Sequence, residues 1–430
     1  MKTICKRTVC FFFHIHQPFR LKTYRFFNIG IDHNYYNEVQ NRTIIEHIAH
    51  VCYLPANEVF MSLIRKLGAE FKVTFGISGT ALEQLKKYVP EVIDSFRQLY
   101  KTGNVEFVAE TYSNSLAMIT HPAEYKRQVK EHEKTLDTLI GCKPTTLANA
   151  NLLYSDLTAG IAQEMGFNTV LVEGAKQVLG WKSPNYLYVS RPYPAVRLLL
   201  RNSQLSDDIS LRFPMREWDQ WPLTAEKLMS WLDSIDKNQE LVNLFMDYGA
   251  LGEYPKSNAG IFRFMDTFIV KMIKSGKWIF RTVSEAAENI RPAASLDIPH
   301  YISWAGEERD LSAWLGNEMQ LDALNTLYTA ADIMENCEDK ELLSDWCKLQ
   351  TCDHFCYMST KYMKESGKYR VFSPYSSPYE AFVNYMNILT DFLIRVKEYA
   401  AHNALSSMLR LVQNRENEGK KQQRYQPETI

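Results

Sequence analysis

Acidic and histidine side chains stand at the ends of short apolar runs, where a parallel β protein places groups that can do acid–base chemistry. The run Leu241–Met246 ends on Asp247, and glycine and alanine residues follow. The run Val9–Phe13 ends on His14, with His16 two residues further on. A carboxylate at the carboxyl end of a buried strand can serve as a general acid or base. The alternative is an aspartate that only caps the next turn.

The two histidines point the same way in an extended chain, and a His-x-His pair can bind zinc. No third ligand is close in sequence, so hydrogen bonding to a substrate hydroxyl explains the pair at least as well. A second group that could suggest a metal consists of Cys347, Cys352, His354 and Cys356. Its spacing fits no zinc pattern, and on a helix the histidine points away from the two nearest cysteines. We predict no metal site and no cofactor.

Three further apolar runs end on polar side chains in the same way. They are Asn104–Ala109 before Glu110 and Tyr112, Thr145–Asn149 before Asn151, and Asn168–Val172 before Glu173. The carboxyl ends of parallel strands meet at one edge, so we expect these side chains to gather there. Helical patterns such as Pro122–Leu139 separate the runs. This alternation predicts an α/β fold of parallel units and favours a barrel over an open sheet.

The order of the elements divides the chain into three parts. Residues 1–298 alternate strands and helices, with strands also expected at Ala195–Leu200 and Ile209–Phe213. Residues 299–415 are expected to form a C-terminal helical bundle, because long helical patterns follow one another there without strands. These patterns are Leu311–Asn336, Lys340–Lys364 and Pro378–Asn414. The polar residues 416–430 are expected to form a disordered tail. No glycine-rich phosphate-binding motif follows a strand, which disfavours nucleotide-binding folds.

The composition narrows the classes of partner. The 430 residues carry a net charge of −1, and no basic stripe stands out, so a nucleic-acid partner is not expected. No apolar run approaches transmembrane length, so a membrane partner is not expected either. Eight irregularly spaced cysteines and a short N-terminal apolar run without a cleavage site predict a reducing, cytoplasmic location. Aromatic residues make up 13%, a level found both in sugar-binding proteins and in large cores.

Six segments together resemble glycoside hydrolase family 57, and within it the α-amylase-like branch. They are His16–Leu21, Val105–Tyr112, Asn149–Gly174, Phe245–Glu253, Ser303–Asn317 and Asp353–Phe355. The segments are spread over nearly the whole chain. The resemblance implies an incomplete seven-stranded (β/α) barrel followed by a helical bundle that closes one side of the active site.

The resemblance also implies a reaction and its residues. In retaining glycosidases one carboxylate attacks the anomeric carbon and another protonates the leaving oxygen, with the two groups about 5–5.5 Å apart. Asp247 matches the family's acid/base. The family's nucleophile is a glutamate in the pattern Asn-Thr-Glu-Leu, but this chain reads Asn-Ala-Asn-Leu, so Asn151 stands at the nucleophile position. A neutral amide is a very weak nucleophile.

Other departures from the family pattern fall in the same region. Gly249 replaces a glutamate, Gly306 replaces an aspartate, Asn114 replaces a histidine, and Tyr254 is a further replacement. Rescue by another carboxylate stays open, and the candidates are Glu110, Glu173 and Glu253. Slow inverting attack by a water held by Asn151 is a second possible route to hydrolysis. A nucleophile supplied by the substrate requires an acetamido group, which an α-glucan lacks.

The sequence therefore predicts a protein that acts on or binds α-1,4-glucans such as malto-oligosaccharides and is catalytically impaired by Asn151; it identifies no protein partner. The residues expected to bind sugar are His14, His16, Glu110, Tyr112, Glu173, Trp218, Trp221, Glu253, Trp304 and Asp353. The alternative is an active retaining hydrolase with Asp247 as acid/base. A carboxylate oxygen about 5–6 Å from Asp247 favours this alternative. A deacetylase of similar topology requires a metal triad of Asp and His that the sequence does not offer.

Overall fold

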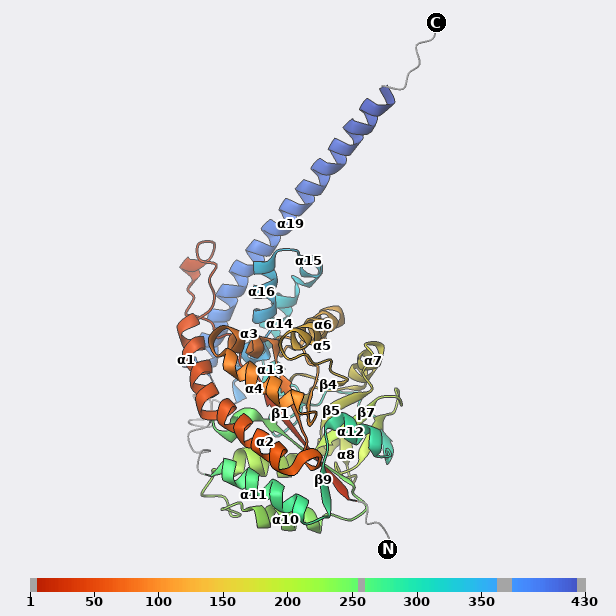
Figure 1. Cartoon of the computed structure of the whole chain (residues 1–430). Helices are drawn as coiled ribbons and strands as arrows, with labels where there is room; N and C mark the ends of the chain where they lie inside the picture. The colour runs from red at the N-terminus through yellow and green to blue at the C-terminus, as the bar shows by residue number, and fades with distance from the viewer. Residues whose placement is uncertain (1–5, 254–259, 362–372, 424–430) are drawn as a thin grey trace.

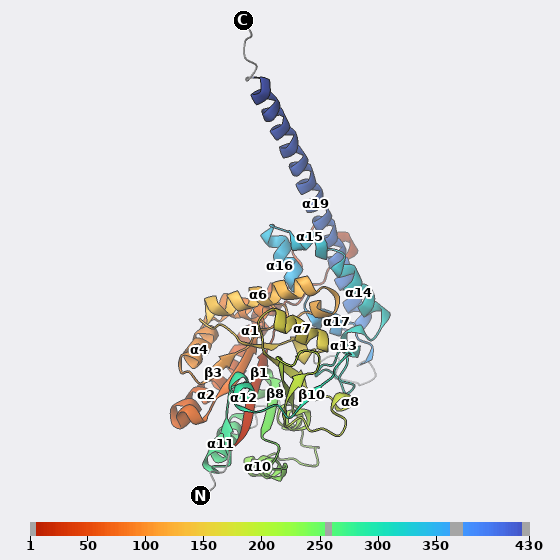
Figure 2. The same cartoon turned by 90° about the vertical axis from the view of Figure 1, so that its right-hand side faces the viewer.

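Seven parallel strands form a barrel in the computed structural model, which describes residues 6–253, 260–361 and 373–423, with side chains up to residue 405 (Figures 1 and 2). The strands are β1 (Arg7–Ile15), β2 (Val73–Ile77), β3 (Val105–Phe107), β4 (Thr146–Ala148), β5 (Thr169–Glu173), β7 (Arg197–Arg201) and β8 (Leu241–Asp247). This is the predicted α/β architecture, and most expected strands and helices lie within a few residues of their predicted bounds.

The length of pairing between neighbouring strands varies around the barrel. β1 pairs with β8 over seven residues, from Thr8 to His14, and with β2 over its last four residues, from Phe12 to Ile15. Two seams are short: β7 meets β8 only at Arg201 and Asn243, and β3 meets β4 through a single bridge between Ala109 and Leu147. At that bridge the Ala109 amide nitrogen lies 2.8 Å from the Thr146 carbonyl oxygen. The short seams make this an incomplete barrel.

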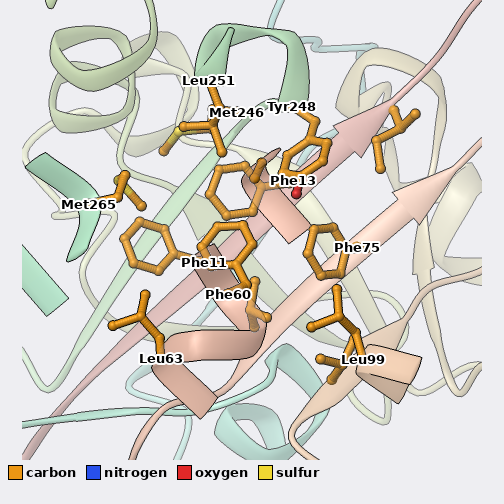
Figure 3. Close-up of a cluster of buried hydrophobic side chains, with 14 of the residues drawn as sticks. Phe11, Phe13, Phe60, Leu63, Phe75, Leu99, Met246, Tyr248, Leu251 and Met265 are labelled. Carbon is orange, nitrogen blue, oxygen red and sulfur yellow. The ribbon is translucent and has the colours of Figure 1, made fainter. Parts of the chain in front are cut away.

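The long apolar run of β1 arises because both of its faces are buried. Phe11 and Phe13 face outward into a core shared with the helices that cover this side of the barrel. This core also contains Phe60, from one of these helices, and Phe75, from β2 (Figure 3). Cys10 and Phe12 alternate with them and belong to a separate cluster that fills the barrel. Fully apolar strands are expected wherever a parallel sheet is covered on both faces.

The helices around the barrel include α2 (Leu54–Leu67), α3 (Gly79–Tyr88), α4 (Pro90–Lys101), α6 (Pro122–Leu139), α7 (Asp156–Glu164), α10 (Ala225–Ser234) and α11 (Ile261–Lys274). A further helix, α12 (Val283–Asn289), closes the amino-terminal end of the barrel, because Val283, Ala286 and Ala287 join the cluster inside the barrel.

The sequence pattern did not predict α12. It also missed β6 (Leu187–Ser190), which runs antiparallel to β7, and β10 (Ala294–Leu296), which pairs with β6. β9 (Trp278–Phe280) extends the sheet beside β1.

The predicted strand at Ile209–Phe213 is wrong. The chain forms a short helix α9 (Ser203–Asp207) followed by a π-helical turn, η5 (Asp208–Arg212). The helix begins here because the Asn202 side chain accepts a hydrogen bond from the Leu205 amide, a helix N-cap. The apolar residues at 209, 211 and 213 have the two-residue period of a strand, but Ile209 is buried whereas Leu211 is exposed.

The C-terminal region is helical, as predicted, but its helices are shorter than the sequence pattern suggested. They are α13 (Ser312–Leu315), α14 (Glu318–Tyr328), α15 (Ala331–Glu335), α16 (Lys340–Leu349), α17 (Cys352–Cys356) and α19 (Pro378–Gln423). α14 begins anew because the Asn317 side chain accepts from the Gln320 amide. The extended conformation of Thr351 separates α16 from α17, and residues 362–364 of the predicted second helix lie outside the described residues.

The last helix, α19, projects away from the barrel (Figure 1). It continues to Gln423, so residues 416–423 are helical where a disordered tail was predicted, and residues 424–430 lie outside the described residues. One buried cluster contains side chains from both sides of Pro299, for example Tyr154 and Trp314. The boundary at 298/299 therefore stays a prediction. Among the described residues no helix is long and apolar enough to cross a membrane.

Candidate active site

Strand alternation directs a set of polar side chains to the carboxyl end of the barrel interior. Phe12, Phe245, Leu171, Leu199 and Val108 face into the barrel. Side chains alternate along a strand, so the residues two positions further on continue the same inward series. These residues are His14, Asp247, Glu173, Arg201 and Glu110. His14 and Asp247 are also direct partners in the register of β1 and β8.

His14 is buried in contact with Glu110. Its Nε2 lies 2.9 Å from Glu110 Oε2, and both side chains are buried. Burial alone would lower the pKa of His14, but the negative charge and hydrogen bond of Glu110 outweigh it, so the pKa is raised. Glu110 is thereby occupied as the hydrogen-bonding partner of a histidine.

His16 connects the barrel to the C-terminal helices. Its Nδ1 lies 2.7 Å from Ser78 Oγ, and its Nε2 lies 2.9 Å from Asp353 Oδ2 at the start of α17. His16 outweighs the effect of burial on Asp353 and keeps the pKa of that carboxyl below its usual value. Asp353 thus lies against His16 at the carboxyl end of β1. Among the side chains that the structure describes, no cluster of three or more metal-ligating groups is placed to hold an ion.

Asn151 is fixed by contacts to both ends of its amide. It lies in a short turn after β4 with φ +52°, a left-handed conformation that asparagine tolerates better than most residues. Its Oδ1 accepts a hydrogen bond from Trp304 Nε1 at 2.9 Å, and its Nδ2 lies 3.2 Å from Cys352 Sγ. Trp304 also packs edge-to-face on His14, with ring centroids 6.0 Å apart. The predicted Trp304 therefore lies directly beside Asn151.

Asn114, another departure from the family pattern, meets the same thiol. Its Nδ2 lies 3.4 Å from Cys352 Sγ. Burial and the nearby Asp353 charge raise the pKa of Cys352 well above its usual value, so the thiol is protonated at neutral pH. The sequence did not assign Cys352 to the site, because its partners come from segments more than 200 residues away.

Asp247 has a second carboxylate beside it. Asp247 Oδ1 accepts a hydrogen bond from the Gly249 amide at 2.6 Å. A Cβ atom at Gly249 would lie 2.8 Å from that oxygen and 2.2 Å from Glu253 Oε2. The two carboxylate oxygens are therefore within about 5 Å of each other, and the Glu253 carboxylate fills the space that a side chain at position 249 would need. The replaced residue Tyr254 lies outside the described residues.

The two acids titrate together. Burial and the charge of Asp247 raise the pKa of Glu253 to about 7. Burial also raises the pKa of Asp247, although the neighbouring His14 opposes the shift. Like charges this close do not both ionise readily, so near neutral pH the pair shares a proton.

The Glu253→Gln variant is expected to lose part of the pH dependence of stability. In the wild type the folded chain holds a proton on Glu253 between the unfolded pKa of 4.5 and about pH 7, so stability falls as pH rises through that window. We expect wild-type unfolding free energy to drop between pH 5 and pH 8 by about 1–3 kcal/mol more than that of the variant. Urea unfolding at the two pH values measures this, with the exposed Glu217→Gln as control. Equal drops in wild type and Glu253→Gln would contradict the raised pKa.

Glu173 is held in a buried ion-pair network. Arg201 Nη1 lies 3.2 Å from Glu173 Oε2, and the same guanidinium pairs with Asp207. Arg309 Nη2 lies 2.9 Å from the other oxygen of Asp207, and Arg309 Nη1 donates to the Trp304 carbonyl. Glu173 is thus a structural partner of arginines and does not face Asp247 as a free carboxylate.

The sequence analysis missed Arg201, Asp207 and Arg309. A usable signal was present at Arg201, because the run Leu198–Leu200 ends on it just as Leu241–Met246 ends on Asp247.

The remaining predicted aromatic residues lie apart from these contacts. The Tyr112 ring packs against α3, where a Cβ at Gly79 would lie 2.3 Å from it. Trp218 packs edge-to-face on Trp231 and lines a cavity of about 1080 Å³ whose lining also includes Arg309. Trp221 is 45% exposed. Their roles in sugar binding stay predictions.

Comparisons with known proteins agree with this architecture. A protein from Methanocaldococcus jannaschii named "Putative alpha-amylase" is 35% identical over 432 aligned residues, which cover 96% of this chain and 89% of that protein. Among solved structures, a branching enzyme from Thermococcus kodakaraensis has a TM-score of 0.66 at 14% identity and covers 91% of this chain and 94% of its own. An α-amylase from Thermotoga maritima has a TM-score of 0.63 at 11% identity, with 90% and 94% covered.

A 4-α-glucanotransferase from Thermococcus litoralis has a TM-score of 0.59 at 14% identity and covers 92% of this chain but 60% of its own. At these identities the solved structures confirm the fold alone. The family model for glycosyl hydrolase family 57 matches residues 10–299, more than half of the chain. Together with the 35% identical relative, this match shows that the chain belongs to glycosyl hydrolase family 57.

Proposed function

We propose that this protein binds α-1,4-glucans at the carboxyl end of its barrel and that it does not hydrolyse them by double displacement. The ligand class is supported by the names of the similar proteins, which include an α-amylase and a 4-α-glucanotransferase. Asn151 carries the second half of the proposal. Its amide stands at the family's nucleophile position and is hydrogen-bonded to Trp304 and close to Cys352. A neutral amide cannot form a stable glycosyl-enzyme intermediate.

The rest of the site is suited to holding a neutral sugar. The Trp304 ring is partly exposed beside Asn151, and aromatic faces of this kind pack against apolar ring surfaces. His16 and Asp353 form a partly exposed hydrogen-bonding pair on the other side of the strand end. None of these groups needs the missing glutamate in order to contact a hydroxyl.

The direct test combines a hydrolysis assay with a binding measurement. Purified wild type and Asp247→Ala are incubated with maltoheptaose, and released sugar is quantified. We expect equal background release from both proteins and saturable binding of maltoheptaose to the wild type in calorimetry. Release by the wild type that is absent in Asp247→Ala would refute the loss of hydrolysis, and absence of any binding would refute the ligand class.

A second candidate function, an active retaining hydrolase, is favoured by one observation. An oxygen of Glu253 lies within about 5 Å of an oxygen of Asp247, no farther apart than the about 5–5.5 Å that separates the two carboxyl groups of retaining glycosidases. A shared proton gives such a pair one acid and one ionised carboxylate, which are the two forms that the reaction requires. Under this function Glu253→Gln would abolish sugar release as completely as Asp247→Ala does. The same hydrolysis assay therefore separates the two candidates.

A further inference from the structure

A large cavity lies beside the carboxyl ends of β5 and β7 and is separate from the contacts around Asn151. Its volume is about 1080 Å³, and its walls come from segments that follow both strands, from the loop that carries Trp218, and from Arg309. Small-molecule sites usually enclose about 300–1,000 Å³, so this space accommodates more than a single sugar ring.

The charges lining the cavity are balanced and partly neutralised. They are Lys176, Arg212 and Arg309 on the positive side and Asp207, Asp208, Asp219 and Glu307 on the negative side. Arg309 is paired with Asp207 at 2.9 Å, and Arg212 is paired with Asp208. A phosphate or another polyanion would find little uncompensated positive charge here. The lining therefore favours a neutral ligand.

The remaining lining has the chemistry that recognises a polyhydroxyl compound. Trp218 offers a partly exposed indole held edge-to-face against Trp231, with ring centroids 6.1 Å apart. The amides of Gln204 and Gln220 line the same space. Trp181 is 93% exposed in the segment 176–185, whose two ends also line the cavity. An indole this exposed adds nothing to the core.

Arg201 and Arg309 connect the cavity to the candidate active site. Arg309 lines the cavity and donates to the Trp304 carbonyl. Arg201 lies 5.6 Å from the centre of the Trp304 ring. Trp304 in turn donates to Asn151. The cavity and the site thus share Arg309, which lines the one and contacts Trp304 in the other.

We propose that this cavity binds a segment of several glucosyl units of an α-glucan, with the Trp218 ring stacked on one of them. This inference rests on the proposed function, because it places the glucan that function requires. It assigns the main contribution to affinity to the cavity and not to Asp247. A ligand of several units also makes affinity depend on chain length.

Calorimetry on the full-length protein tests this with maltose and maltoheptaose. We expect maltoheptaose to bind the wild type at least about tenfold more tightly than maltose, and Trp218→Ala to weaken maltoheptaose binding at least about tenfold. Trp218→Phe, which keeps an aromatic face, is expected to lose less. The control is Phe27→Ala, at an exposed residue in a loop packed on α19, and it is expected to bind like the wild type. Asp247→Ala is measured beside it, because its affinity shows how much of the binding depends on the end of the barrel instead of the cavity.

The outcomes separate this inference from the proposed function. Wild-type affinity in both Trp218 variants, with binding lost in Asp247→Ala, would overturn the cavity proposal while leaving glucan binding intact. If Trp218→Ala loses binding and also has a lowered melting temperature, Trp218→Phe decides. A folded Phe variant that loses as much affinity as Trp218→Ala would overturn the proposal, and a folded Phe variant that loses less would support it. A wild type that binds neither sugar would refute both proposals.

Discussion

The Asn151→Glu variant is expected to release sugar from maltoheptaose at least about a hundredfold faster than the wild type. Under the proposed function, the substitution places an ionisable carboxylate at the position that the resemblance assigns to the nucleophile, and Asp247 is the proposed acid. In hydrolases whose groups act as a unit, removing the nucleophile alone costs about 10⁶ in turnover. We expect only part of this factor, because Gly249, Gly306 and Asn114 also depart from the family pattern.

The backbone conformation and the hydrogen-bond donors around Asn151 determine how well a glutamate at this position can act as a nucleophile. The backbone conformation, φ +52°, costs a residue other than glycine, asparagine or aspartate about 1 kcal/mol. Trp304 Nε1 can donate to a carboxylate as it does to the amide, and the protonated Cys352 thiol can donate as well. Asn151→Gln, which has the same length without the charge, is the matched control. If Asn151→Glu is no faster than Asn151→Gln, the missing carboxylate does not limit turnover, and the remaining changes in the pocket do.

The sequence predicted the strand ends well because their signal is local. An apolar run buried on both faces that stops on His14 or Asp247 is visible without knowing any partner. Strand alternation then places both side chains inside the barrel, and register brings them together. The resemblance added the identity of the acid and the altered nucleophile position, which periodicity alone does not reveal.

The partners of these residues could not be predicted, because they depend on contacts between distant segments. Cys352 meets Asn151 only because α17 packs on the barrel, and helical spacing predicted a buried helix face. Glu173 was expected to bind sugar, but Arg201 and Arg309 flank it. The approach of Glu253 to Asp247 depends on the empty space at Gly249, which a sequence shows only as a substitution.

Replacing Arg201 by alanine is expected to lower the free energy of unfolding by about 3–5 kcal/mol at pH 8. Arg201 is 4% exposed and pairs with Glu173, which is 1% exposed, so the variant leaves a buried carboxylate without its main partner. The substitution also removes a 2.8 Å hydrogen bond from Nε to the Phe245 carbonyl oxygen in β8, at the seam where β7 and β8 share only one residue pair. Urea unfolding followed by circular dichroism measures the change.

The pH dependence of this loss distinguishes a broken ion pair from a simple cavity. Burial already raises the pKa of Glu173, and Arg201 opposes that shift in the wild type. Without Arg201 the folded variant holds the proton to higher pH, so its deficit relative to the wild type should shrink as pH falls from 8 to 5. Arg191→Ala, which removes an exposed pair with Asp297 at 3.2 Å, should cost less than about 0.5 kcal/mol. A deficit for Arg201→Ala that is equally large at both pH values would assign the loss to packing and would mean that Glu173 does not depend on the guanidinium charge.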